Sequence, residues 1–279
     1  MTVTKQAPPA MPIHLEIPVF SPSSALHAQA IGAQRIELNA RGSYAVGGTT
    51  PALADLEGVN NWLMVPVRIM IRPRGKRPED EVDFVYDDDE FEVMVRDVER
   101  FRGVLRGERG DGFVFGVLER RSGDGGVVVD VERNRRLVEA AGGLACSFHR
   151  AFDEVIRDGE MKTITRGVRD LVCCGFEGVL TSGGPGNAAE NRAALEVVVR
   201  EASLEGVVKM MTNGAGKETG KGLEVIVGGG VRKENVEGLV DGFGGARVWA
   251  HSSCFTGKCA EGEVDDEEAM GILERLAER

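Results

Sequence analysis

The sequence predicts a single α/β domain built as a TIM (β/α)8 barrel with loop insertions. Short apolar runs alternate with longer segments of helical period along nearly the whole chain of 279 residues, and this alternation repeats eight times. Continuous apolar runs, each followed by a helix, are typical of parallel strands, and eight such units in roughly 250 residues match the size of this barrel. A doubly wound open sheet is the alternative. The count of eight, and the absence of a GxGxxG motif after the first run, favour the barrel.

The expected strands are short and rich in apolar and β-branched residues. The third ends before Pro73, which cannot donate the backbone hydrogen bond that a central strand needs. We expect strands over residues 14–19, 35–38, 65–71, 112–118, 144–148, 178–181, 223–227 and 246–250.

The expected helices carry recognisable start and stop signals. Ser21 followed by Pro22 is typical of an N-cap and first helical position, and Gly32 and Gly175 each stop a helix. We expect helices over residues 25–31, 51–63, 87–105, 130–141, 161–174, 188–202, 233–239 and 265–278.

Two segments interrupt the alternation. Residues 106–127 surround the fourth strand and are rich in Gly, Arg and Glu, and residues 205–222 precede the seventh strand and are rich in Gly and Lys. We interpret their Gly-rich parts as mobile loop insertions without evident chemistry. Residues 1–12 are expected to be disordered or extended, which leaves one domain over residues 13–279.

Composition and charge argue against several function classes. Lys and Arg number 34 and Asp and Glu number 45, so the net charge of −11 disfavours binding to nucleic acid. No apolar run approaches the ~20 residues of a membrane span, and the N-terminus has no features of a secretory or import signal. We therefore expect a cytoplasmic protein. Five cysteines without a CxxC pair indicate neither a disulfide scaffold nor a zinc ribbon.

Polar or glycine-rich groups lie at or just after the carboxyl end of every predicted strand, which is the end where such barrels build their active sites. Because all eight strands show this feature, it is more informative than the ordinary polarity of loops. The groups are Glu16, Glu37, Arg72, Glu119, then His149, Arg150 and Asp153, then Thr181 and Ser182, Gly228–Gly230, and finally His251, Ser252 and Ser253.

Glu16, Glu37 and Arg72 either meet around a substrate or form a structural salt-bridge layer. Crowded carboxylates in a low-dielectric site differ in pKa, which suits one as an acid and the other as a base. Strand alternation also places Arg35 on the face of Glu37 and Arg68 on that of Arg72. If those faces point inward, the interior holds further charges, and these must be paired.

His149, Arg150 and Asp153 form the densest chemical cluster. Histidine is the usual proton shuttle, arginine offers a fork for a carboxylate or phosphate, and the aspartate can orient either one. A core histidine beside a capping aspartate is the alternative. The candidate catalytic residues are therefore Glu16, Glu37, Arg72, His149, Arg150 and Asp153.

The glycines after the seventh strand indicate an anion site. Gly228–Gly230 and Arg232 precede a short helix, and barrels often hold phosphate after strands seven and eight. A glycine triplet is also an ordinary turn. The anion-binding candidates are Ser182, Gly229, Gly230 and Ser252.

The most specific motifs are Ile-Arg-Pro-Arg-Gly at residues 71–75 and Phe-His-Arg-Ala-Phe-Asp at residues 148–153. With Leu-Glu-Ile (15–17), Arg-Ile-Glu-Leu (35–38), Gly-Gly-Thr-Thr-Pro (47–51), Leu-Thr-Ser-Gly (180–183) and His-Ser-Ser (251–253), they run in order from about residue 13 to 256. Together they resemble the CutC family of copper homeostasis proteins. The resemblance implies a cytosolic TIM barrel, a homodimer, and a link to copper tolerance or copper binding.

Copper binding depends on ligands that this sequence replaces. Many family members carry cysteines just after the first two strand glutamates, and Cu(I) prefers soft thiolates. Pro18, Val19 and Asn39 stand there instead, which leaves His251 with Cys254 as the candidate metal ligands. Three function classes remain: a copper-handling protein, an enzyme acting on a small anionic molecule by acid–base chemistry, and a non-catalytic binding protein.

Overall fold

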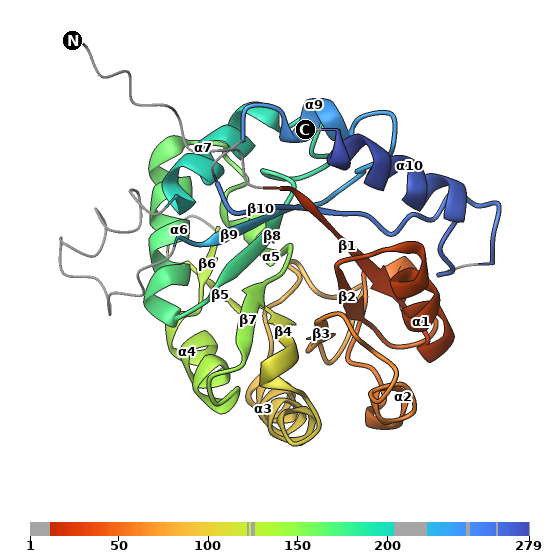
Figure 1. The fold of residues 1–279 in the computed structure, drawn as a ribbon. Coiled ribbons are helices and arrows are strands. Elements are labelled where there is room, and N and C mark those ends of the chain that lie inside the picture. Colours follow the sequence, from red (N-terminus) through yellow and green to blue (C-terminus); the bar gives the residue numbers. More distant parts are fainter. Residues whose placement is uncertain are drawn as a thin grey trace, which may run out of the picture.

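Eight parallel strands close into a barrel in the computed structural model, and helices surround it (Figure 1). The structure describes residues 12–121, 123, 126–203, 222–243, 246–260 and 262–278. The predicted TIM barrel is therefore confirmed. Around the barrel the strands are β1 (His14–Val19), β2 (Arg35–Leu38), β3 (Val67–Met70), β4 (Gly112–Phe115), β7 (Ala145–Phe148), β8 (Gly178–Thr181), β9 (Glu224–Val227) and β10 (Val248–His251).

Alternate residues of each strand face two different environments. Leu15, Ile17 and Val19 of β1 belong to the apolar cluster between the strands and the helices. Glu16 lies between them in the sequence and therefore points into the barrel. Buried apolar residues that lie outside that cluster occupy lumen-facing positions in four other strands: Met70, Val114, Leu180 and Ile226.

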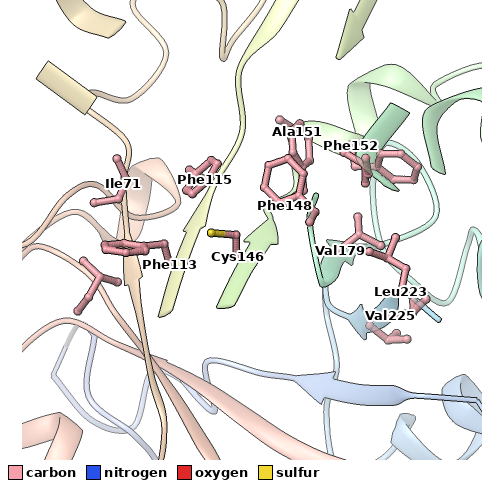
Figure 2. Packing of buried hydrophobic residues seen from close by; sticks show 14 of the residues in the cluster. Ile71, Phe113, Phe115, Cys146, Phe148, Ala151, Phe152, Val179, Leu223 and Val225 are labelled. Carbon is pink, nitrogen blue, oxygen red and sulfur yellow. The ribbon is translucent and has the colours of Figure 1, made fainter. Parts of the chain in front are cut away.

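Aromatic side chains occupy much of the layer between β4, β7 and the helices outside them. Figure 2 shows Phe113 and Phe115 of β4 beside Cys146 and Phe148 of β7, with Val179 of β8 continuing the layer. Burying one such ring stabilises the fold by about 1.5–3 kcal/mol. Cys146 lies in this layer and not in the lumen, as the strand parity predicts.

Local signals set the helix ends. The side chain of Ser21 accepts a hydrogen bond from the backbone N–H of Ser24, and Asp87 and Glu90 form a capping box at the start of the third helix. The helices are α1 (Pro22–Ile31), α2 (Leu53–Glu57), α3 (Asp88–Arg102), α4 (Val131–Ala140), α5 (Ala151–Val155), α6 (Met161–Cys174), α7 (Arg192–Ala202), α9 (Val236–Val240) and α10 (Asp266–Ala277).

The chain after β4 departs from the prediction. The strand expected over residues 112–118 ends at Phe115, and an antiparallel hairpin of β5 (Leu118–Arg120) and β6 (Val127–Val129) follows it. Asn134 stabilises this departure, because its side chain donates to the carbonyl of Val117 at 2.7 Å and accepts from its N–H at 3.1 Å. The insertion expected to be a loop is therefore partly a hairpin.

This hairpin removes Glu119 from the predicted site. Glu119 belongs to β5 and lines an outer groove together with Asp88 and Arg133, away from the barrel mouth. The prediction that Glu119 lies at the end of a barrel strand was wrong, because the fourth strand is shorter than its apolar run suggests.

Several helices are also shorter than expected. The helix predicted over residues 51–63 spans only Leu53–Glu57, and the one over 233–239 is Val236–Val240. The short helix α5 was not predicted. The insertion over residues 205–222, except Gly222, and the N-terminal segment, except Pro12, lie outside the described residues. No helix in the described part of the chain is long and apolar enough to cross a membrane.

Candidate functional site

A cavity of about 630 Å³ opens where the barrel strands end, at the face that carries the predicted site residues. Its volume suits a small molecule. Most of the sequence-predicted residues line it: Glu37, Arg72, His149, Arg150, Asp153, Gly229, Gly230, His251 and Ser252. Glu16 and Ser182 are buried directly behind this lining, where they contact His251 and Arg150.

Strand register gives Glu16 two charged partners. In the β1 register, Glu16 lies beside Arg35 of β2 and beside His251 of β10. Its carboxylate accepts from Arg35 Nε and lies 2.7 Å from His251 Nδ1. Burial alone would raise the pKa of Glu16, but these two partners hold it at about 2. A lowered pKa favours the ionised form of Glu16 at neutral pH.

Arg35 extends this network toward the opposite end of the barrel. Its Nη1 donates to Glu224 Oε1 at 2.7 Å, and its guanidinium lies 3.9 Å from the centre of the Trp249 ring. Arg35 is therefore paired, as expected for an interior charge. Arg68 instead donates to the carbonyl of Gly110 at 2.6 Å and forms no ion pair with a carboxylate of the described residues. Glu224 and Trp249 were not singled out from the sequence, although their positions at the start of β9 and within β10 place both on inward-facing strand positions.

Glu37 contrasts with Glu16. Its Oε1 accepts from Asn39 Nδ2 at 3.0 Å, whereas its Oε2 is buried and has no hydrogen-bond partner among the described residues. Burial raises the pKa of Glu37, although the nearby His251 opposes that shift. The two mouth carboxylates therefore differ in pKa in opposite directions, which agrees with the expectation for crowded acids.

His251 connects the two carboxylates. Ligand atoms of Glu16, Glu37 and His251 all lie within 4.8 Å of one another. Burial lowers the pKa of His251, but the hydrogen bond to Glu16 and the charge of Glu37 outweigh burial, and the net pKa is raised. This trio can hold a proton or a cation at the mouth of the barrel.

Asp153 positions Arg150. The Asp153 carboxylate accepts from Arg150 Nε at 2.8 Å, from Thr181 Oγ1 at 2.5 Å and from the backbone N–H of Ser182 at 3.0 Å. Arg150 Nη2 also donates to Ser182 Oγ at 2.7 Å. The Arg150 side chain remains 42% exposed, so its cationic head faces the cavity with its position fixed from behind. Asp153 acts here by orienting Arg150.

Arg72 holds two loops together. Its Nη1 donates to the carbonyls of Val46 and Gly48, at 2.5 and 2.9 Å, and its Nη2 donates to Asp83 at 2.8 Å. The guanidinium also lies 4.9 Å from the centre of the Phe84 ring. Phe84 itself contacts His149 and was not predicted, since nothing in the local sequence distinguishes it from other loop residues.

The cysteines do not form part of the cavity wall. All five lie in the described part of the chain, and none lines the cavity. Cys254 is buried, its Sγ lies 3.6 Å from the carbonyl oxygen of Ser252, and burial raises its pKa to about 12. The ligand atoms that come together around His251 belong to Glu16 and Glu37.

Gly229 is expected to be required for the position of Arg150. Its φ is +90°, and an added Cβ would lie 2.8 Å from Ser182 Cβ and 3.4 Å from Arg150 Cζ. We expect Gly229→Ala to destabilise the fold by more than the ~1–2 kcal/mol cost of a left-handed alanine and to weaken anion binding. Urea unfolding and phosphate titration measure both effects.

Gly143→Ala provides the matched control, because Gly143 has a φ of +92° and open space around its Cβ position. The Gly143→Ala variant should lose only the stability that a left-handed backbone conformation costs an alanine. Equal losses of stability in the two variants, with unchanged anion binding, would contradict the role given to Gly229.

Comparison with known proteins gives consistent matches. The sequence model described as "CutC family" matches residues 13–255. A CutC family protein from Xanthomonas campestris is 36% identical over 230 residues, which cover 82% of this chain and 79% of the relative. One from Porphyromonas gingivalis is 32% identical over 229 residues, covering 82% and 76%.

Solved structures show the same fold. The crystal structure of the putative copper homeostasis protein CutC from Streptococcus agalactiae has a TM-score of 0.64 and 26% identity, covering 86% of this chain and 98% of that one. Phosphoribosylanthranilate isomerase from Pyrococcus furiosus has a TM-score of 0.54 at 13% identity, covering 96% and 100%, and shares the fold alone.

Proposed function

Because the chain belongs to the CutC family, we propose that it serves copper homeostasis through a cavity that binds a small phosphate- or carboxylate-bearing molecule and performs acid–base chemistry on it. The copper-homeostasis part is supported by the likeness to the Streptococcus agalactiae protein, which is described as a copper homeostasis protein. The activity rests on one observation: a single cavity brings arginine head groups together with a proton-holding group of two carboxylates and a histidine.

Arg232 is the strongest candidate for holding the anion. Its Nη1 donates to its neighbour's carbonyl at 2.8 Å, and its Nη2 donates to the carbonyl of Phe255 at 3.3 Å. No carboxylate of the described residues forms an ion pair with it, so its positive charge is not neutralised. Gly229, Gly230 and Ser252 lie in the same wall. The whole protein is acidic, but this wall favours an anion.

Glu37 and His251 supply the proton chemistry. Burial raises the pKa of Glu37, and a carboxyl group with a raised pKa holds a proton more readily, which suits a general acid or base. His251 has a raised pKa and is held by Glu16, so it acts as the neighbouring proton donor. Both residues line the cavity that Arg232 lines.

Titration with inorganic phosphate and with malonate, followed by calorimetry, tests anion binding. We expect both anions to bind the wild type and Arg232→Met to weaken binding. Arg100→Met on α3, at a side chain 61% exposed, serves as the control and should bind normally. Native mass spectrometry of the purified wild type should reveal a small acidic ligand. Absence of any binding to the wild type would overturn the proposal.

Metal binding is the second candidate, favoured by the 4.8 Å grouping of Glu16, Glu37 and His251. Two carboxylates and an imidazole suit a divalent cation, whereas Cu(I) prefers thiolates, which this cavity lacks. The residues therefore fit Cu(II) or another divalent ion better than Cu(I). Such an ion would act as a Lewis acid toward a bound oxygen.

Calorimetric titrations with Cu(II), Zn(II) and Mn(II), and with Cu(I) under reducing conditions, separate the two candidates. Metal binding at this trio predicts that Glu37→Gln and His251→Ala abolish uptake of a divalent ion and that Arg232→Met does not. Uptake of Cu(I) that depends on Cys254 would instead support the ligand pair expected from the sequence. Wild-type protein that binds none of these ions would exclude this candidate.

A further inference from the structure

We infer that His149 is an uncharged hydrogen-bond donor that binds an oxygen atom of the cavity ligand through Nε2–H, and that it does not act as the proton shuttle. The acceptor it fits is a carbonyl, carboxylate or phosphoryl oxygen. This inference deepens the proposed function and rests on it for the nature of the ligand. It also assigns different roles to the two cavity histidines, with proton transfer left to Glu37 and His251.

The hydrogen bonding of the ring indicates which nitrogen carries the proton. The backbone N–H of Ala151 donates to His149 Nδ1 at 3.3 Å. A ring nitrogen that accepts a hydrogen bond carries no proton, so the proton of the neutral imidazole is on Nε2. The chain itself keeps His149 and Ala151 close together, because β7 ends at Phe148 and α5 begins at Ala151.

The surroundings keep the ring neutral. His149 is 3% exposed, and burial together with the positive charge of Arg72 lowers its pKa to about 3, although its own backbone opposes that shift. No carboxylate of the described residues forms a hydrogen bond or an ion pair with the ring. His251 differs in this respect, because Glu16 accepts from it. A neutral imidazole near an arginine is suited to donating a hydrogen bond and poorly suited to carrying a proton between groups.

Packing fixes the orientation of the ring. Gly116 has no side chain, and a Cβ there would lie 2.8 Å from both Nδ1 and Cε1 of His149. On another side the Phe84 ring is 4.7 Å away, centre to centre. Phe84 has a φ of +67°, a strained backbone conformation for a phenylalanine. Its chain neighbour Asp83 is held by Arg72 Nη2 at 2.8 Å.

The other ring nitrogen of His149, Nε2, is buried without a hydrogen-bond partner in the described part of the chain, and His149 lines the cavity. A buried donor without a hydrogen-bond partner is unfavourable, so its presence in a rigid setting points to a ligand that satisfies it. A purely structural core histidine would instead have both nitrogens bonded by the protein.

The ¹⁵N spectrum of histidine-labelled protein tests the tautomer directly, since the chain has only 4 histidines. We expect one neutral ring with a protonated Nε2 that does not titrate between about pH 5 and 8. The signal is assigned by its loss in His149→Gln. Inorganic phosphate or malonate should shift the Nε2–H resonance. A doubly protonated ring near neutral pH, an Nδ1–H tautomer, or a resonance that neither anion shifts would overturn the inference.

Binding by variants tests the role of the donor. Glutamine places an amide N–H close to the position of Nε2, whereas methionine fills the space without a donor. We expect His149→Met to weaken phosphate binding about tenfold, the contribution of one hydrogen bond, and His149→Gln to retain most of it. Far-ultraviolet circular dichroism and urea unfolding check that both variants fold.

The outcomes separate this inference from the proposed function. Weaker phosphate binding in Arg232→Met with normal binding in His149→Met would overturn the inference and leave the proposed anion site intact. The reverse pattern would support the His149 donor and contradict the role of Arg232. Wild-type protein that binds neither phosphate nor malonate would overturn both.

Discussion

Arg35→Met is expected to destabilise the barrel by about 3–5 kcal/mol at neutral pH. The substitution leaves Glu16 and Glu224 buried without the cation that both contact. Equilibrium unfolding in urea, followed by circular dichroism, measures the loss. Arg136→Met is the matched control, because Arg136 forms an exposed ion pair with Glu92 on the outer surface. Solvent screens that pair, so its loss should change the stability little.

The pH dependence of stability gives a second measurement of the Arg35–Glu16 ion pair. Since the pKa of Glu16 in the fold is about 2 against an ordinary 4.5, its ionisation stabilises the native state above pH 4.5. This contribution is lost as the pH falls from 4.5 toward 2. The difference between wild type and Arg35→Met should therefore shrink over that range. A difference that is small at pH 7, or that grows on acidification, would contradict the role of Arg35.

Glu37→Gln is expected to make the protein more stable at neutral and alkaline pH. The Oε2 atom of Glu37 is buried without a partner, and glutamine resembles the protonated acid. Relief of one unsatisfied buried charge should increase the free energy of unfolding by on the order of 1–3 kcal/mol. Phosphate binding should persist, because Arg232 is unchanged.

The sign of the pH effect follows from the raised pKa of Glu37. A carboxyl group whose pKa is higher in the fold than in the unfolded chain favours folding at low pH, and this contribution is lost as the pH rises through the folded pKa. The stability advantage of Glu37→Gln should therefore be absent below pH 4.5 and grow above it. Urea unfolding at several pH values measures this.

Glu16→Gln is the matched comparison for Glu37→Gln. The pKa of Glu16 is lowered, so loss of its charge should destabilise the protein where Glu37→Gln stabilises it. Two glutamate-to-glutamine changes at one site would then have opposite effects. Destabilisation of similar size in both variants would show that Glu37 is paired in solution, which contradicts the unpartnered geometry of its Oε2.

Much of the candidate site was predictable because parallel strands converge at their carboxyl ends. The positions of Glu37, His149 and His251 after buried strands were sufficient to place all three at one cavity. The same reasoning gave the wrong position for Glu119. Its apolar run continues past the end of β4, and only the hairpin of β5 and β6 shows that the chain has left the barrel.

Roles within the site were less predictable, because they depend on partners distant in the sequence. Nothing near Glu16 or Glu37 distinguishes their surroundings, yet β1 register gives Glu16 both Arg35 and His251. Likewise, burial and the positive charge of Arg72 lower the pKa of His149, and Phe84 packs on its ring; both Arg72 and Phe84 come from the segment after β3. No periodicity or propensity identifies that loop as a cover for the histidine.

Apolar periodicity and strand-end polarity are local patterns, and they were enough to predict the barrel and the end at which its polar residues gather. The hydrogen-bond partners of the buried side chains, and the directions in which their pKa values shift, became visible only in the folded structure. Those properties are set by burial and by contacts between strands and loops far apart in the chain. In this protein they separate two glutamates and two histidines that look equivalent in the sequence.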